Sequence, residues 1–114
     1  MEKRQQLRTQ AIQPVNVYDL LSGEYLGALA NISTEGFMLI TSKQLSSSQL
    51  YQCQIQVTFT AGDKNDIELT AECLWVKASN TPENNWAGFQ TIDISEHGLC
   101  QVQKLVELLE QKTA

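Results

Sequence analysis

The chain has 114 residues, of which 42% are hydrophobic and 18% charged, a balance typical of one folded domain and unlike that of a disordered segment. Eight Lys and Arg residues against 13 Asp and Glu residues give a formal net charge of −5. This acidic balance argues against a general binder of nucleic acids or anionic membranes, because such proteins need a broad basic field. The two arginines, Arg4 and Arg8, nevertheless lie four positions apart, and Lys3 stands beside them.

The first ten residues are polar and lack the periodicity of a core segment, so residues 1–10 are predicted to form a flexible arm before one domain at 11–114. No apolar stretch follows the charged start, so we expect no secretory signal. No apolar run approaches the ~18 residues that a membrane span requires. Cys53, Cys73 and Cys100 have neither disulfide-framework nor zinc-like spacing. We therefore expect a cytoplasmic protein without membrane insertion.

Alternation of apolar and polar residues predicts six short antiparallel strands. The predicted strands are, in chain order, residues 12–18, 25–32, 37–41, 52–59, 67–78 and 86–94. Turn signals separate them, including Ser22-Gly23 and the polar run at 61–65. The C-terminal segment changes to a spacing of three to four residues, which predicts an amphipathic helix at 96–112 with Ser95 as its N-cap. The pattern favours a small barrel or sandwich whose open edge or end the helix covers.

Several kinds of chemical site are excluded by the residues present. His97 is the single histidine, so a two-histidine metal site cannot form, and no phosphate-binding glycine loop occurs. Residues 63–66 begin like a calcium loop, but Glu68 and Leu74 occupy the positions that require Gly and Glu. No nucleophile–base pair can be identified. We therefore predict a protein without catalytic activity, metal or cofactor.

Two short motifs remain. Arg4 and Arg8 form an RxxxR pattern, which could also be no more than solubilising charge. Residues 31–36 read (D/N)xSxxG, in which Asn31 and Ser33 share one face of a strand and can offer an amide and a hydroxyl to a ligand. An Asn/Ser turn bonded to its own backbone is the alternative. The same pattern recurs at 93–98, where the capping role of Ser95 already explains it.

Together these motifs resemble those of the PilZ domain family, the bacterial receptors for cyclic di-GMP. The family has an RxxxR, then a strand, then (D/N)xSxxG, and a Gly and a nearby Phe in its last strand, as at Gly88 and Phe89. The resemblance implies a six-stranded antiparallel split β-barrel followed by a helix. It also implies a ligand site made of Arg4, Arg8, Asn31, Ser33 and Gly36, with Lys3, Trp75 and Gly88 as weaker candidates.

The function that follows is that of a cyclic di-GMP sensor. Arginine suits this ligand, because its planar fork binds phosphate or the guanine edge and can stack on a base. Trp75 is a candidate stacking platform, although alternation places it in phase with buried Cys73 and favours the core. The arm is expected to become ordered on binding and to signal to an unidentified protein partner in motility or biofilm regulation. The alternatives are a ligand-independent adaptor and, disfavoured by the charge, a barrel for single-stranded nucleic acid.

Overall fold

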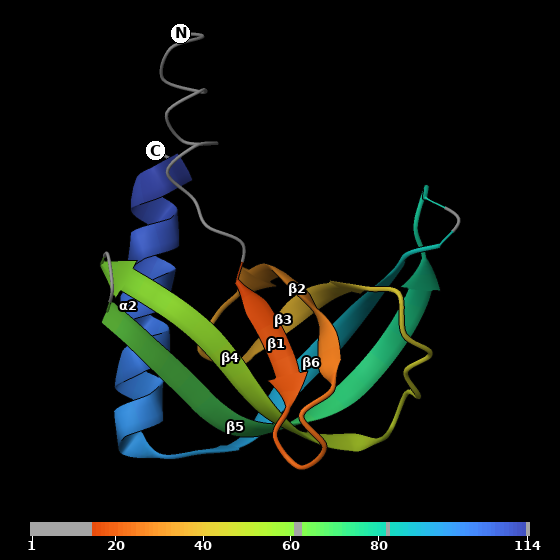
Figure 1. Ribbon diagram of the computed structural model, residues 1–114, viewed down its shortest axis with the longest axis horizontal. Coiled ribbons are helices and arrows are strands. Elements are labelled where there is room, and N and C mark those ends of the chain that lie inside the picture. The colour runs from red at the N-terminus through yellow and green to blue at the C-terminus, as the bar shows by residue number, and fades with distance from the viewer. Residues whose placement is uncertain (1–14, 61–62, 82, 114) are drawn as a thin grey trace, which may run out of the picture.

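The protein folds into a closed barrel of six antiparallel strands followed by one helix (Figure 1). The computed structural model describes residues 15–60, 63–81 and 83–113. The elements are β1 (Asn16–Asp19), β2 (Tyr25–Ile32), β3 (Gly36–Thr41), β4 (Leu50–Thr60), β5 (Asp63–Ala78), β6 (Asn85–Ile94) and α2 (Glu96–Thr113). Around the barrel the order is β1-β2-β3-β6-β5-β4, and β1 closes the ring by pairing with β2 and β4. The predicted fold class is confirmed.

The core fills the inside of the barrel with the apolar phase of the strands. On β4, Cys53, Ile55 and Val57 are buried, while Gln52 and Gln56 on the opposite side of the strand are exposed. The rings of Phe37 and Phe89, which are cross-strand partners on β3 and β6, stack with their centroids 5.0 Å apart. Alternation with a period of two therefore separates an apolar interior from a polar outer surface over most of the barrel.

Helix α2 packs against β5 (Figure 1) and buries Val102 and Leu105 in the core cluster. The Gly98 N–H donates to Ser95 Oγ at 3.0 Å, which confirms the predicted N-cap. A Cβ on Gly98 would lie 2.9 Å from Cγ1 of Ile94, so a glycine lets the first helical turn approach the end of β6. Glycine weakens the first helical turn, and this close contact is the structural reason for its presence. The Leu and Val stripe of the helix covers the barrel as expected.

The hairpin of β4 and β5 is longer than the sequence predicts. We expected a turn at 61–65, but β5 already begins at Asp63, and Thr58 pairs with Lys64. Residues 63–65 carry no apolar alternation, so the side-chain pattern gives no sign of a strand there. Backbone hydrogen bonds between neighbouring strands do not require that alternation, and the ladder continues past the last apolar position. In the part of the chain described, no helix is long and apolar enough to span a membrane.

Candidate functional site

The segment between β2 and β3 is a tight turn that holds the second motif. The Ser33 N–H donates to the Gly36 carbonyl at 2.8 Å, and Ser33 Oγ accepts the Glu35 N–H at 3.2 Å. The hydroxyl is thus bonded to its own backbone, as in the alternative interpretation of this motif, while the side chain stays exposed. Asn31 is exposed as well, and Ile32 between them packs against the core. The expected shared outward face of Asn31 and Ser33 is present.

Gly36 allows this turn to lie close to the neighbouring strand. A Cβ at this position would stand 2.2 Å from the carbonyl oxygen of Phe89 on β6, far inside any real contact. The Thr91 N–H also donates to the Glu35 carbonyl at 2.9 Å, which fixes the turn to β6 from the other side. The glycine of the motif therefore has a structural reason, namely the close packing of the turn on β6.

One row of cross-strand partners runs over the outside of the barrel from β2, next to the turn, to β5. The row runs across four strands in the order Asn31 on β2, Met38 on β3, Gly88 on β6 and Trp75 on β5. Cross-strand partners project their side chains to the same side of a sheet. Asn31 and Trp75 therefore share the outer face, and Met38 and Gly88 lie between them. Met38 could not be identified from the sequence, because its place in the row depends on the pairing of β3 with β6.

Trp75 faces outward and not into the core, which corrects the placement that alternation favoured. Its side chain is 38% exposed, whereas Cys73 is fully buried. The register between β5 and β6 shifts between Cys73 and Trp75, and this bulge places both Leu74 and Trp75 on the outside. A Cβ on Gly88 would lie 2.3 Å from Cε2 and 2.5 Å from Nε1 of Trp75, so the indole lies over Gly88.

The first motif, with Lys3, Arg4 and Arg8, lies outside the described residues. The described chain begins at Val15, whose carbonyl accepts the Leu29 N–H at 2.8 Å. Leu29 stands two positions before Asn31, so the chain enters the barrel beside the strand that carries Asn31. Arg8 precedes Val15 by seven residues, a length that can span at most about 25 Å. Chain length therefore permits Arg8 to reach the row.

The buried thiols of Cys53 and Cys73 are expected to be unreactive. Burial, with a smaller contribution from the Asp19 carboxylate, raises the pKa of Cys53 to about 12. Burial also raises the pKa of Cys73, against an opposing hydrogen bond to the Trp75 carbonyl. Both thiols stay protonated at neutral pH and behave as small hydrophobic side chains, as the sequence predicts. Among the residues with described positions, no cluster of His, Cys, Asp and Glu is arranged to hold a metal ion.

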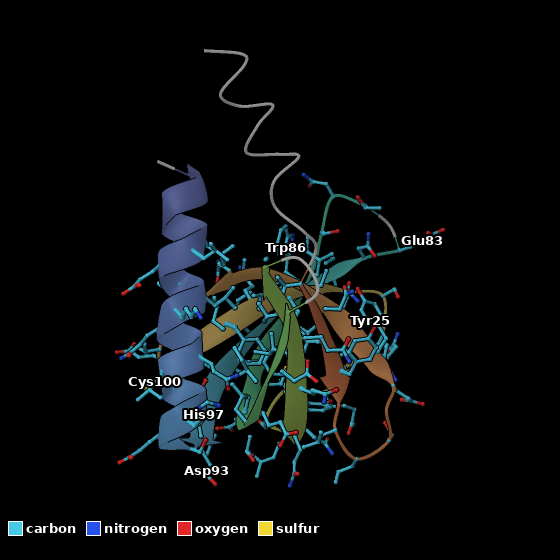
Figure 2. The ribbon with its side chains drawn as sticks, turned by 60° about the vertical axis from the view of Figure 1, so that its left-hand side comes forward. Tyr25, Glu83, Trp86, Asp93, His97 and Cys100 are labelled. Carbon is cyan, nitrogen blue, oxygen red and sulfur yellow. The ribbon has the colours of Figure 1, made fainter. Side chains whose placement is uncertain are left out.

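The second copy of the (D/N)xSxxG pattern lies elsewhere on the molecule. Figure 2 shows Asp93 at the end of β6, next to the first turn of α2 with His97, while Trp86 lies near the opposite end of β6. Ser95 of this copy caps α2. His97 and Cys100 are exposed on the helix. This copy of the pattern therefore lies at the junction of β6 and α2, where Ser95 caps the helix as predicted.

One protein-family model matches almost the whole chain. The model of the PilZ domain matches residues 2–111. The chain belongs to the PilZ domain family. The match includes the positions of both motifs, and the closed six-stranded barrel with its C-terminal helix agrees with it. No curated protein matches this PilZ sequence closely enough to count as a relative.

Solved structures share the fold at low sequence identity. The inhibitor of motility MotI/DgrA from Bacillus subtilis superposes with a TM-score of 0.69 at 14% identity, over 86% of this chain and 46% of that chain. The PilZ domain of YcgR from Escherichia coli with c-di-GMP superposes at 0.63 and 15% identity, over 88% and 83%. YcgR in complex with c-di-GMP gives 0.63 and 16%, over 88% and 42%. This PilZ chain thus spans about half the length of MotI and of the longer YcgR chain.

Proposed function

We propose that this PilZ domain is a receptor for cyclic di-GMP, with the ligand on the outer face along the row from Asn31 to Trp75. The observation that carries the proposal is this row, which puts an exposed amide and an exposed indole on one side of four adjacent strands. Membership of the PilZ family supports it, as does the YcgR PilZ domain solved with c-di-GMP. Arg4 and Arg8 would reach this row from the arm, with Lys3 adding positive charge.

The chemistry of the row suits a ligand with two phosphates and two guanines. The backbones of Asn31 and Trp75 stand three strand spacings apart, about 14 Å along the sheet. The indole offers a flat apolar surface to a base, and the amide of Asn31 and the Ser33 hydroxyl offer hydrogen bonds near the turn. Gly36 lets the turn lie close to β6, and Gly88 leaves the space in which the indole of Trp75 lies.

An order-of-magnitude balance shows what the arm has to contribute. A micromolar affinity requires about 8 kcal/mol. Two charge-assisted arginine contacts supply about 3–6 kcal/mol, and stacking of one base supplies ~1–3 kcal/mol. The arginines therefore carry the largest share, and the exposed indole supplies much of the rest. Binding and not catalysis is the function we infer.

The output we propose is a change in the arm that a protein partner reads. The arm joins the barrel at Val15, beside β2, so a ligand held by the arginines and by Asn31 links the arm to the barrel surface. We place the protein in the cytoplasm, in bacterial control of motility or biofilm formation. The similarity of fold to an inhibitor of motility supports that setting. A ligand-independent adaptor is the alternative, and the bonded hydroxyl of Ser33 is the observation that favours it.

Isothermal titration of the full chain with cyclic di-GMP tests the receptor function. We expect micromolar binding that Arg4→Ala or Arg8→Ala abolishes and that Arg8→Lys weakens, since lysine keeps the charge but loses the fork. Lys104→Ala, which removes one charge from α2, is the matched control and should bind like the wild type. Binding unchanged by both alanine substitutions would refute the site, and no binding by the wild type would favour the adaptor.

A further inference from the structure

Five of the large apolar side chains that are exposed among the described residues lie on four neighbouring strands of the barrel. The side chains concerned are between 36% and 60% exposed, and they are Ile40, Leu50, Leu74, Trp75 and Ile92. They come from β3, β4, β5 and β6, which are consecutive in the barrel. We call this set the apolar face. Scattered exposed hydrophobic residues need no explanation, but a group on adjacent strands marks a contact surface.

Two bulges lie within the apolar face. Leu74 is the extra residue of β5 between Cys73 and Trp75, and it is 48% exposed. Ile92 is the extra residue of β6 at the shift between Thr70 and Ala71, and it is 51% exposed. Leu74 and Ile92 keep the outward phase of Glu72 and Gln90, and the bulge at Leu74 adds Trp75 to the same side. This departure from the sheet pattern places two large apolar side chains next to each other on the outside of β5.

The charges on β5 indicate what covers the apolar face. The outward side chains along the strand are, in order, Glu72, Leu74, Trp75 and Lys77, with buried Cys73 and half-buried Val76 between them. Glu72 stands two positions before Leu74, and Lys77 stands two positions after Trp75. Neither side chain forms an ion pair with another described residue. The strand therefore carries a carboxylate and an ammonium two positions away from either end of an apolar centre, the Leu74–Trp75 pair.

A two-fold axis through that centre makes the strand complementary to itself. With the axis between Leu74 and Trp75, in the plane of the contact and perpendicular to β5, Glu72 of each copy meets Lys77 of the other. The apolar centres then meet, as in an isologous interface. A foreign protein would have to supply this antisymmetric charge pattern, whereas a second copy of the chain already has it.

We propose that in the free protein a second copy of this chain packs on the apolar face about this two-fold axis. Five side chains on the convex outside of a barrel form a small contact, so the dimer is weak and reversible. The dimer itself is independent of the proposed ligand. One extension rests on the proposed function: Trp75 belongs to both the row and the apolar face, so cyclic di-GMP and the second copy compete for it.

Sedimentation equilibrium of the full chain between about 10 μM and about 1 mM tests the dimer. We expect the wild type to associate with concentration and Leu74→Ser to weaken association by about ten-fold. Leu21→Ser is the matched control, because Leu21 is 79% exposed in the turn between β1 and β2. A wild type that stays monomeric throughout, or a dimer that Leu74→Ser does not weaken, would overturn the proposal.

A charge exchange tests the two-fold axis without touching the apolar residues. Glu72→Lys and Lys77→Glu should each weaken the dimer, because each places like charges opposite one another in both halves of the interface. The double variant should recover most of the wild-type association. Failure of the double variant to recover would exclude this axis, even if Leu74→Ser failed to fold and gave no information.

Adding cyclic di-GMP separates the dimer from the receptor function. We expect the ligand to shift the wild type toward the monomer and to leave the dimer of Arg8→Ala unchanged. A dimer that forms in a protein that binds no cyclic di-GMP would refute the receptor and leave the dimer standing. A monomer that binds the ligand would refute the dimer alone. A dimer that binds the ligand without dissociating would refute the competition for Trp75.

Discussion

The indole of Trp75 lies over Gly88, and a Cβ on that glycine would come within 2.3 Å of the ring. The two residues are cross-strand partners on β5 and β6, in the same row as Asn31. The glycine therefore leaves the space in which the indole, the aromatic side chain of the row, lies. This relationship connects a residue without a side chain to the proposed recognition of a base.

Gly88→Ala should displace the indole and weaken cyclic di-GMP binding by about ten-fold, since the stacking surface is worth ~1–3 kcal/mol. Titration calorimetry measures the loss, and tryptophan fluorescence reports the changed surroundings of the ring. If Gly88 acts through Trp75, the Gly88→Ala/Trp75→Ala double variant binds no more weakly than Trp75→Ala alone. Additive losses would show that Gly88 has a separate role.

Gly36→Ala should destabilise the fold, because its Cβ would meet the backbone oxygen of Phe89 at 2.2 Å. Backbone cannot move aside as a flexible side chain can, so we expect a loss of about 2–4 kcal/mol in the free energy of unfolding. Urea denaturation measures it. Thr34→Ala, at an exposed position of the same turn, is the control and should stay within about 0.5 kcal/mol of the wild type.

The two serines of the repeated pattern should respond differently to alanine. Ser95→Ala removes the N-cap bond to the Gly98 N–H and should cost about 1 kcal/mol of stability without changing ligand affinity. Ser33→Ala should lower the affinity for cyclic di-GMP, because Ser33 stands on the exposed outer side of the turn. Denaturation and calorimetry on both variants give the comparison. Equal effects of both serines on affinity would contradict the assignment of the two copies.

Glu35→Gln should strengthen ligand binding. The Glu35 side chain is exposed in the turn that holds Ser33 and Gly36, where its carboxylate repels a ligand with two phosphates. For an exposed charge the gain is about two- to five-fold in affinity at low salt, and it shrinks as salt is added. Glu83→Gln, in the loop between β5 and β6, should change the affinity little. A gain that persists at high salt would point to a contact other than charge repulsion.

Cys53 should make stability fall in alkaline solution. Its pKa is raised from 9.0 to about 12 in the folded protein, mainly by burial, so the unfolded chain loses its thiol proton first. Stability is therefore unaffected below pH 9 and decreases between pH 9 and about 12, by about 1.4 kcal/mol for each pH unit. Denaturation series of wild type and Cys53→Ala isolate this contribution from other groups. Parallel pH profiles of the two proteins would contradict it.

The sequence predicted local structure where side-chain alternation and caps determine it. The bounds of β2 and the start of α2 at Glu96 follow from such signals, and both agree with the structure. The outward position of Trp75 could not be predicted in this way. It results from a bulge in the pairing of β5 with β6. Alternation within one strand does not show how that strand is aligned with its neighbour.

The candidate site likewise has one part that could be predicted from local sequence and one part that could not. Asn31, Ser33 and Gly36 are close in sequence, so their common turn could be predicted from the motif. Their connection to Trp75 requires β3 to pair with β6 across two intervening strands of the chain, a long-range pairing that no local pattern encodes. The positions of Arg4 and Arg8 lie outside the described residues, and their part in binding stays a prediction.

Closure of the barrel by β1 has a consequence for how this protein can meet other molecules. Where β1 pairs with β2 and with β4, the strands form a ring, so the backbone groups of that paired stretch have neighbours on both sides and offer no template for strand addition. A molecule that docks on this closed stretch is therefore recognised through side chains and not by adding a strand to the sheet.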